Sequence, residues 1–367
     1  MKKIILIAVA VLLFTNCEKK EGLPELSAEN IPSNDQIASS FVKVLNEETN
    51  QQNIFSQLQN SDLPISLTDM FSRLIPSEKQ MRFLFSASIS KKADNREVYE
   101  FWLHHNTDTF NPEEVLVAYA PDNAEQLKSI TAFDLQGNKI ELDAKTPPEV
   151  PVIVIEKNGF HALQLRVEDM NDKLQKAGLQ SKTAVTLKNF KSYQKTNLET
   201  TKLDKISLKD DQEPWIKGGA EIYAITSGIR DTNNAPELKI IPMYYLDDED
   251  ETYYPNQIML FWDEYQYQAA NIQLFEQDSN YNYQELISII IDGVTQITGT
   301  LSGQPWVNAL GNIAGAIIDA LPEQWYTDDD DYIDSFYTIE KNKSYSNHYG
   351  ASKNAKVDLS PFTVLGN

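Results

Sequence analysis

The stretch ANIQLFEQDSNYNYQELISIIIDGVTQITGTLSGQPWVNALGNIAGAIIDAL, residues 270–321, decides the predicted fold of the second half of the chain. Its first five residues alternate apolar and polar side chains, as a strand does. Two apolar segments follow at 283–297 and 306–321, with glycines and a proline between them. This pattern predicts a strand followed by a helical hairpin.

Further strands are expected on both sides of this stretch, from short runs rich in β-branched and aromatic residues. They are Glu221–Ser227, Glu237–Tyr245, Gln257–Trp262 and Ile333–Glu340. We therefore predict a mainly-β sandwich over residues 213–367, with the helical insertion at 283–321 covering one of its faces. The glycine spacing of Gly311 and Gly315 suits close helix packing, and it leaves membrane insertion of the hairpin as the alternative.

The preceding residues, 34–212, predict an α+β domain with a mostly antiparallel sheet and a linker. Apolar residues recur at helical spacing between Asp35 and Leu58, after possible capping side chains at 33–35. The Asn158-Gly159 dipeptide lies between two apolar runs, Pro151–Glu156 and Phe160–Val167, which indicates a β-hairpin. Residues 168–212 are polar and rich in lysine, so the connection between the two domains is expected there.

The N-terminus has the three parts of an export signal. Lys2 and Lys3 precede the apolar run Ile4–Phe14, which is too short to span a membrane and suits a signal peptide over residues 1–16. The run ends at Cys17, the only cysteine in the chain. This pattern resembles the bacterial lipobox, and the alternative is a signal anchor with an incidental cysteine.

The lipobox resemblance implies that Cys17 carries acyl chains and attaches the protein to a membrane. Residues 17–33 then form a lipidated tether. Residue 18 is Glu rather than Asp, which by the sorting rule for Gram-negative lipoproteins indicates the outer membrane, on either its periplasmic or its surface face. With its only thiol lipidated, the protein has no cysteine left for an internal disulfide.

The net charge of −22 disfavours nucleic acid as a partner, because an acidic chain repels phosphate. The acidity is concentrated in residues 240–340, which contain 19 Asp or Glu and no Lys, Arg or His. Two clusters, 247–251 and 328–331, contain only carboxylates. Such oxygen-rich loops suit Ca²⁺ better than zinc or copper. The alternative is that the loops are simply solvated.

Two short segments resemble parts of C2-type calcium-binding sandwiches. Residues 272–278 are similar to the strand that leads into a calcium loop, and residues 330–334 are similar to the return into the next strand. The resemblance departs at Glu276 and Asp334, which stand for an Asp and a Gly, and about 50 residues are inserted between the halves. It implies metal ligands among Asp247, Asp250, Glu276, Asp278, Asp330, Asp331 and Asp334.

Over most of its length, the chain also resembles an uncharacterised family of bacterial lipoproteins that carry a domain of unknown function. The segments that carry the likeness are Ala118–Pro121, Ala132–Asp134, Pro147–Val154 and the stretch from Tyr253–Gln257 to Phe275–Glu276. This resemblance brings no activity with it.

Catalytic signatures are absent from the sequence: there is no zinc-protease motif, serine-nucleophile elbow or phosphate-binding glycine loop. We therefore expect a non-catalytic, calcium-stabilised binding or adhesion module. Its ligand would be a glycan or a protein, which the many tyrosines between 244 and 337 could contact. Two alternatives remain open: a carbohydrate-processing enzyme or accessory protein that uses the acidic cleft, and a purely structural envelope protein.

Overall fold

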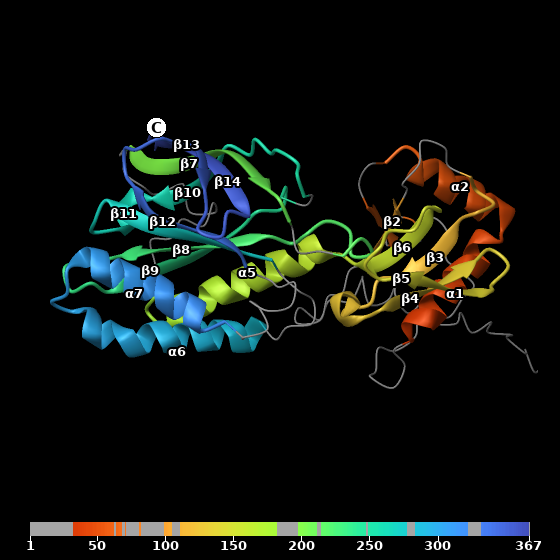
Figure 1. The fold of residues 1–367 in the computed structure, drawn as a ribbon, viewed down its shortest axis with the longest axis horizontal. Coiled ribbons are helices and arrows are strands. Elements are labelled where there is room, and N and C mark those ends of the chain that lie inside the picture. The colour runs from red at the N-terminus through yellow and green to blue at the C-terminus, as the bar shows by residue number, and fades with distance from the viewer. Residues whose placement is uncertain are drawn as a thin grey trace, which may run out of the picture.

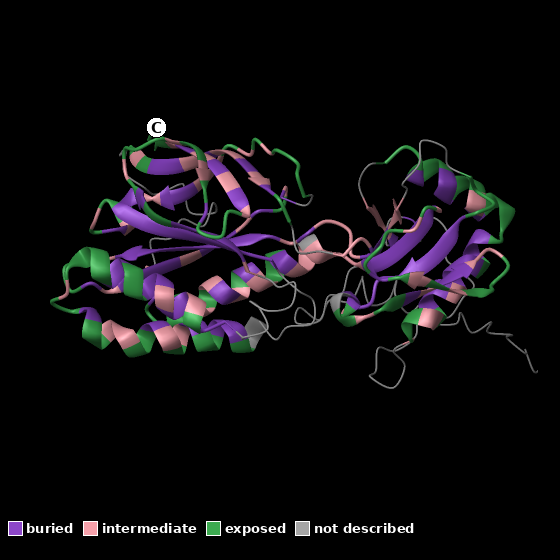
Figure 2. Cartoon of the chain, viewed as in Figure 1, coloured by how far each residue is buried: buried purple, intermediate pink, exposed green. Residues whose placement is uncertain are grey.

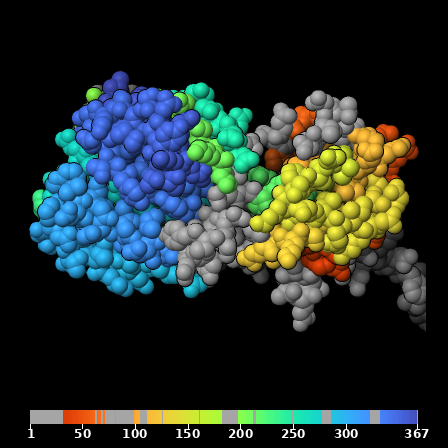
Figure 3. All heavy atoms as spheres, viewed as in Figure 1, coloured from red at the N-terminus to blue at the C-terminus, as the bar shows by residue number. Residues whose placement is uncertain are grey.

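The computed structural model describes residues 32–61, 64–67, 70, 81, 99–104, 111–181, 197–210, 214–246, 249–276, 283–321 and 332–366. They form two lobes that lie side by side (Figure 1). The space-filling view shows the same division, with red to yellow atoms in the N-terminal lobe and mainly green to blue atoms in the C-terminal lobe (Figure 3). The protein is thus of mixed α+β class with a β-rich C-terminal part.

The N-terminal lobe contains a six-stranded sheet in the order β1-β2-β6-β3-β4-β5. Its strands are β1 (Ile65–Ser66), β2 (Tyr99–His104), β3 (Leu116–Tyr119), β4 (Ser129–Asp134), β5 (Lys139–Asp143) and β6 (Val152–Lys157). All neighbours are antiparallel except β3 and β6. The sheet is therefore mostly antiparallel, as predicted, and its parallel pair arises because the chain crosses from β5 at the edge to a place beside β3.

Two helices cover one face of this sheet: α1 (Asn34–Leu45) and α2 (Glu48–Leu58). Ser33 caps α1 in a reciprocal arrangement with Gln36, which satisfies two backbone N–H groups of the first turn. The apolar face of α1 packs on the sheet, with the rings of Phe41 and Phe101 5.4 Å apart. The central strands β3 and β6 are almost wholly buried, as their purple ribbons show (Figure 2).

The C-terminal lobe contains two four-stranded antiparallel sheets. The first, in the order β10-β7-β14-β13, comprises β7 (Leu198–Leu208), β10 (Gln257–Phe261), β13 (Tyr345–Tyr349) and β14 (Ala355–Val364). The second, in the order β12-β11-β8-β9, comprises β8 (Tyr223–Ile229), β9 (Pro236–Pro242), β11 (Ala269–Phe275) and β12 (Tyr332–Glu340). Apolar residues of both sheets share one core, so the sheets pack face to face as a sandwich.

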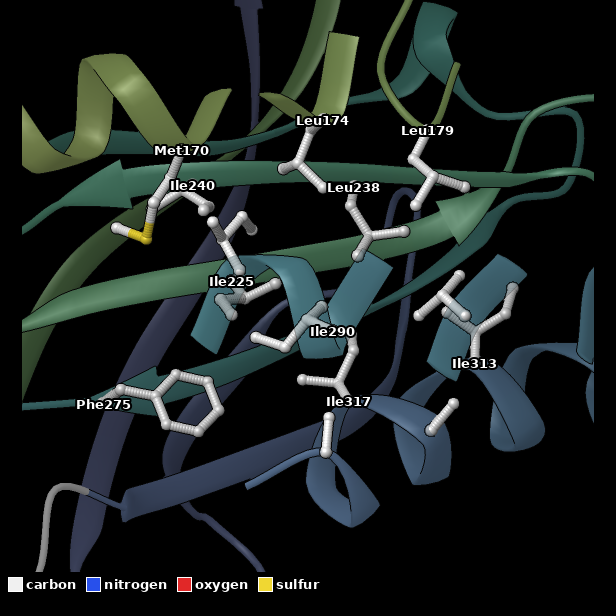
Figure 4. Packing of buried hydrophobic residues seen from close by; sticks show 14 of the residues in the cluster. Met170, Leu174, Leu179, Ile225, Leu238, Ile240, Phe275, Ile290, Ile313 and Ile317 are labelled. Atoms are coloured by element: carbon white, nitrogen blue, oxygen red, sulfur yellow. The ribbon is translucent and has the colours of Figure 1, made fainter. Parts of the chain in front are cut away.

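Three helices cover the outer face of the second sheet: α5 (Gly159–Lys176), α6 (Tyr283–Leu301) and α7 (Trp306–Asp319). Figure 4 shows Met170 and Leu174 of α5, Ile290 of α6, and Ile313 and Ile317 of α7 around the apolar side chains of the strands. The predicted helical hairpin is thus confirmed, and it covers the sandwich.

The expected helix-packing role of Gly311 and Gly315 is wrong. A Cβ atom added at either glycine would meet no other atom within 4 Å. The two glycines therefore face open space, and the buried face of α7 is formed by its larger residues, Leu310, Ile313 and Ile317.

The predicted hairpin around Asn158-Gly159 is also wrong, because the second run is helix α5. Asn158 caps this helix by accepting a hydrogen bond from the N–H of His161 at 2.6 Å. Leu163, Val167 and Leu174 then form a buried stripe against the second sheet. The chain consequently passes into the second lobe at residue 158, and the expected boundary near 213 falls between two segments of that lobe.

Candidate functional site

One end of the sandwich gathers the strand ends that flank the acidic segments. Phe275, the last residue of β11, pairs with Tyr223 at the start of β8 and with Tyr332 at the start of β12. Tyr223 in turn pairs with Pro242 at the end of β9. The acidic segments that follow β9, follow β11 and precede β12 therefore leave the sheet at the same end.

Three of the predicted ligand residues are described, and all lie near this end. Glu276 follows β11 and is buried. Asp250 is exposed, has a positive φ of 57°, and donates its N–H to the carbonyl of Leu208 at 2.8 Å. Asp334 is the third and lies in β12. The other predicted residues, Cys17, Asp247, Asp278, Asp330 and Asp331, lie outside the described residues.

The carboxylate of Asp334 holds the backbone of the β13–β14 turn. Its Oδ1 accepts the N–H groups of Ser335 at 2.7 Å and Ser352 at 2.8 Å, and its Oδ2 accepts the N–H of Ala355 at 2.8 Å. The side chain is fully buried. Gly350 makes room for it, because a Cβ at that position would lie 2.2 Å from the Asp334 carboxyl carbon. Asp334 thus acts as an internal anchor, and its role as a loop ligand stays a prediction.

The described residues do not by themselves assemble a cation site. Within the described ranges, no three Asp, Glu, His or Cys side chains are grouped so that they could hold a metal ion. Glu276 and Asp250 would need partners from the neighbouring acidic segments. Calcium binding at this end therefore remains a prediction.

A second cluster, which the sequence did not indicate, lies where the two lobes meet. Glu100 of β2 and Glu156 of β6 are directly opposite each other in the sheet, and both are buried. Asn158 donates its side-chain N–H to Glu100 Oε2 at 2.5 Å while it caps α5. One amide side chain therefore joins a carboxyl of the first lobe to the first turn of a helix of the second.

Residues 214–218 return from the second lobe and cover this part of the first sheet. Ile216 is buried in the small core beneath β3 and β6. Trp215 packs on His104, with ring centroids 4.9 Å apart, and donates its indole N–H to the carbonyl of Asp143 at 3.1 Å. A Cβ at Gly218 would lie 3.0 Å from a carboxylate oxygen of Glu156, so glycine lets the backbone approach the acidic pair closely.

Burial raises the pKa of Glu100 from 4.5 to about 7, and the hydrogen bond from Asn158 opposes this effect only in part. A carboxyl group in an apolar setting loses the hydration that stabilises its charged form. This carboxyl can therefore gain or lose a proton near neutral pH, as groups at functional sites often do.

Replacing Glu100 by glutamine is expected to remove a pH dependence of stability. The pKa of this carboxyl is higher in the folded than in the unfolded chain. The stability that the protonated carboxyl contributes to the fold is therefore fully present below pH 4.5, and it is lost as pH rises through about 7. Relative to wild type, Glu100→Gln should be nearly neutral at pH 4.5 and more stable by about 3 kcal/mol at pH 8. Denaturant unfolding at several pH values measures this difference, and a constant difference across that range would contradict the prediction.

The far end of the sandwich contains a second buried charged network. Burial raises the pKa of Glu237, which nevertheless accepts the N–H of Ser181 at 2.6 Å and pairs with Arg230 at 3.3 Å. The same guanidinium group donates to the carbonyl of Gly178 at the end of α5. These contacts tie α5 to the β8–β9 turn, so we interpret this network as structural.

The outer face of the first sheet of the sandwich is the broad surface that α5, α6 and α7 leave uncovered (Figure 1). Lys205 pairs there with Asp358 at 3.1 Å, and Lys202 pairs with Asp204 at 2.8 Å. The aromatic rings of Tyr349 and Phe362 are half exposed, with Lys356 and Lys202 near them. This face offers both ring surfaces and charged groups to a ligand.

Glu100 and Glu156 could have been noticed from their strands, where each stands among apolar and aromatic residues in YEFWLH and VIVIEK. A glutamate in such a run is expected to be buried and to need a partner. Their cross-strand pairing, however, depends on the register of β2 against β6, which local sequence does not specify.

Together, the fold and these contacts define a two-lobed α+β protein whose β-rich lobe is partly covered by helices. The chain belongs to the family described as "Protein of unknown function (DUF3103)", whose model matches residues 34–366. No curated protein and no solved structure matches the chain. None of the helices in the described part of the chain is long and apolar enough to cross a membrane.

Proposed function

We propose that this protein is a lipid-anchored, non-catalytic binding module of the outer membrane, stabilised by calcium at the acidic end of its C-terminal lobe. The N-terminal segment supports the anchor, since a short apolar run ends at the single cysteine, Cys17. The acidic composition of residues 240–340 supports a hard cation.

The convergence of strand ends carries the calcium proposal. Residues 276–331 separate β11 from β12 in the chain, yet the two strands are neighbours with Phe275 opposite Tyr332. In the sequence, Glu276 directly follows β11 and Asp331 directly precedes β12, and the strand ends Phe275 and Tyr332 are paired. This is the relation that a C2-like loop requires of its two halves, and we accordingly propose a C2-like sandwich.

The ligand of the module is proposed to be a glycan or a protein that docks on the open face of the β10-β7-β14-β13 sheet. Exposed aromatic rings such as Tyr349 and Phe362 can stack on sugars or fill small pockets in a partner. A glycan panel scored for both binding and hydrolysis separates this proposal from that of an enzyme. Hydrolysis that is lost in carboxylate variants would contradict a non-catalytic role.

Calcium is expected to raise the melting temperature of the mature chain, compared here as a Cys17→Ser variant in calcium and in EDTA. A cation that binds only the folded state stabilises it by about 2.7 kcal/mol at 100 times its dissociation constant. For a lobe of this size, that corresponds to a rise of roughly 5 °C or more. Asp278→Asn should remove most of the rise.

Asp358→Asn is the matched control, because Asp358 lies on the open face and pairs with Lys205. It should leave the calcium effect intact. Equal melting temperatures in calcium and EDTA, unaltered by Asp278→Asn, would reject calcium binding at these loops.

A further inference from the structure

A single residue links the last strand of the first lobe to the first helix of the second. Asn158 directly follows β6 of the first lobe and directly precedes α5 of the second. Helix α5 is fixed in the second lobe by Leu163, Val167 and Leu174, which share its core. A change in the angle between the lobes must therefore rotate the backbone at or beside Asn158.

The side chain of Asn158 opposes such a rotation. Its carbonyl oxygen accepts the N–H of His161 in α5, at 2.6 Å, and its amide nitrogen donates to Glu100 in β2, at 2.5 Å. One bond is made to each lobe. Rotation of α5 away from the sheet must break or lengthen at least one of them.

The segment before β8 also packs close to Glu100 and Asn158. Gly218 lies against two residues beside Glu100. Glu156 is the cross-strand neighbour of Glu100 in β6, and Trp102 lies two residues after Glu100 in β2. Glu221 contacts Gly159, where an added Cβ would overlap its carboxylate. Asn158 therefore contacts Glu100 itself and Gly218 contacts the residues beside it, and withdrawal of both from the sheet would admit water to Glu100.

We propose that Glu100 and Asn158 form a proton-controlled clamp on the hinge between the lobes. While Glu100 is protonated, the lobes keep the angle seen in this structure. Ionisation of Glu100 favours a separated arrangement, because the buried carboxylate gains hydration when the hinge opens. Opening of the hinge and release of a proton are thereby linked.

Other ionisable groups surround the hinge on each element that packs there. They are Glu156 and Lys157 of β6, the latter paired with Asp122, then His104 of β2, His161 of α5, and Lys217 and Glu221 of the covering segment. Burial, rather than any of these charges, is the main cause of the raised pKa of Glu100. Its strand neighbour β1 contributes only Ile65 and Ser66, neither of which titrates.

The test measures the distance between the lobes in the mature chain carrying Cys17→Ser. Spin labels are attached at Gln136→Cys, in an exposed turn of the first lobe, and at Ser302→Cys, in the exposed turn between α6 and α7. We expect one distance at pH 5.5 and a second, separated population at pH 8.5. The equilibrium constant for closing should fall about 30-fold between these pH values, given a carboxyl with a pKa of 4.5 in the open form and about 7 in the closed form.

Two variants and a control sharpen the test. Glu100→Gln should give the closed distance at both pH values, since it accepts the Asn158 bond and does not ionise. Asn158→Asp keeps the helix cap but cannot donate, so it should populate the open form even at pH 5.5. Glu237→Gln removes a buried carboxyl remote from the hinge and should leave the wild-type response unchanged. A wild-type distance that is independent of pH, or a response that persists in Glu100→Gln, would overturn the clamp.

Discussion

Asp334→Ala is expected to lower the free energy of unfolding by about 3–5 kcal/mol. The substitution leaves the backbone N–H groups of Ser335, Ser352 and Ala355 without their acceptor, and Ser335 and Ala355 are buried. Each unsatisfied buried donor loses its bond to water without replacement. Urea unfolding of the mature chain measures the loss directly.

A matched control for this variant is Asp358→Ala. Asp358 also accepts a backbone N–H, from Asn347, but it lies on the open face where water can replace it. Asp358→Ala should lower the free energy of unfolding by less than about 1 kcal/mol. The effect of Asp334→Ala should also be the same in calcium and in EDTA. A large effect that vanishes in EDTA would show that Asp334 acts through a metal, contrary to the anchor described here.

Cys17→Ala is expected to move the protein from the membrane fraction to the soluble fraction when it is expressed in a Gram-negative host. Each acyl CH₂ buried in the bilayer contributes about 0.8 kcal/mol, so loss of the acyl chains removes the whole attachment. Incorporation of labelled palmitate should fall to background in the same variant. Persistent membrane association without the label would indicate a signal anchor in place of lipidation.

The residue after the cysteine supplies the control for location. Glu18→Asp should keep the lipid label and the membrane association, while the sorting rule predicts retention in the inner membrane. Separation of the two membranes by density would show this shift. An unchanged distribution would remove the argument that places the protein in the outer membrane.

Long, uninterrupted patterns predicted their elements correctly. The apolar segments after residue 282 form α6 and α7, and the alternating run before them forms β11. These patterns are local, because the side chains that face the core recur at the period of the helix or strand itself. Such a pattern is compatible with packing against many different sheets or helices, so it does not specify the partner.

Strand β7 lies in the segment whose polar, lysine-rich composition predicts a linker. Its buried residues Leu203, Ile206 and Leu208 do not alternate strictly, because the pairing with β14 shifts between Leu203 and Lys205. Its outward residues include Lys202 and Lys205, which are balanced by partners on the open face. A bulge and a solvated face thus made a central strand of the sheet look like a polar connection.

The segment around Asn158 shows most clearly what the sequence alone determined. It specified a break after β6 and a residue able to turn the chain, and both a hairpin and a capped helix satisfy that requirement. The helix prevails because Leu163, Val167 and Leu174 find a sheet face to cover, and that sheet is built largely from residues far along the chain. Only this packing places Asn158 against Glu100, and burial between the lobes then gives that carboxyl a pKa of about 7. Local sequence thus determined where β6 ends and the next element begins, whereas the neighbours that set burial and charge came from tertiary contacts.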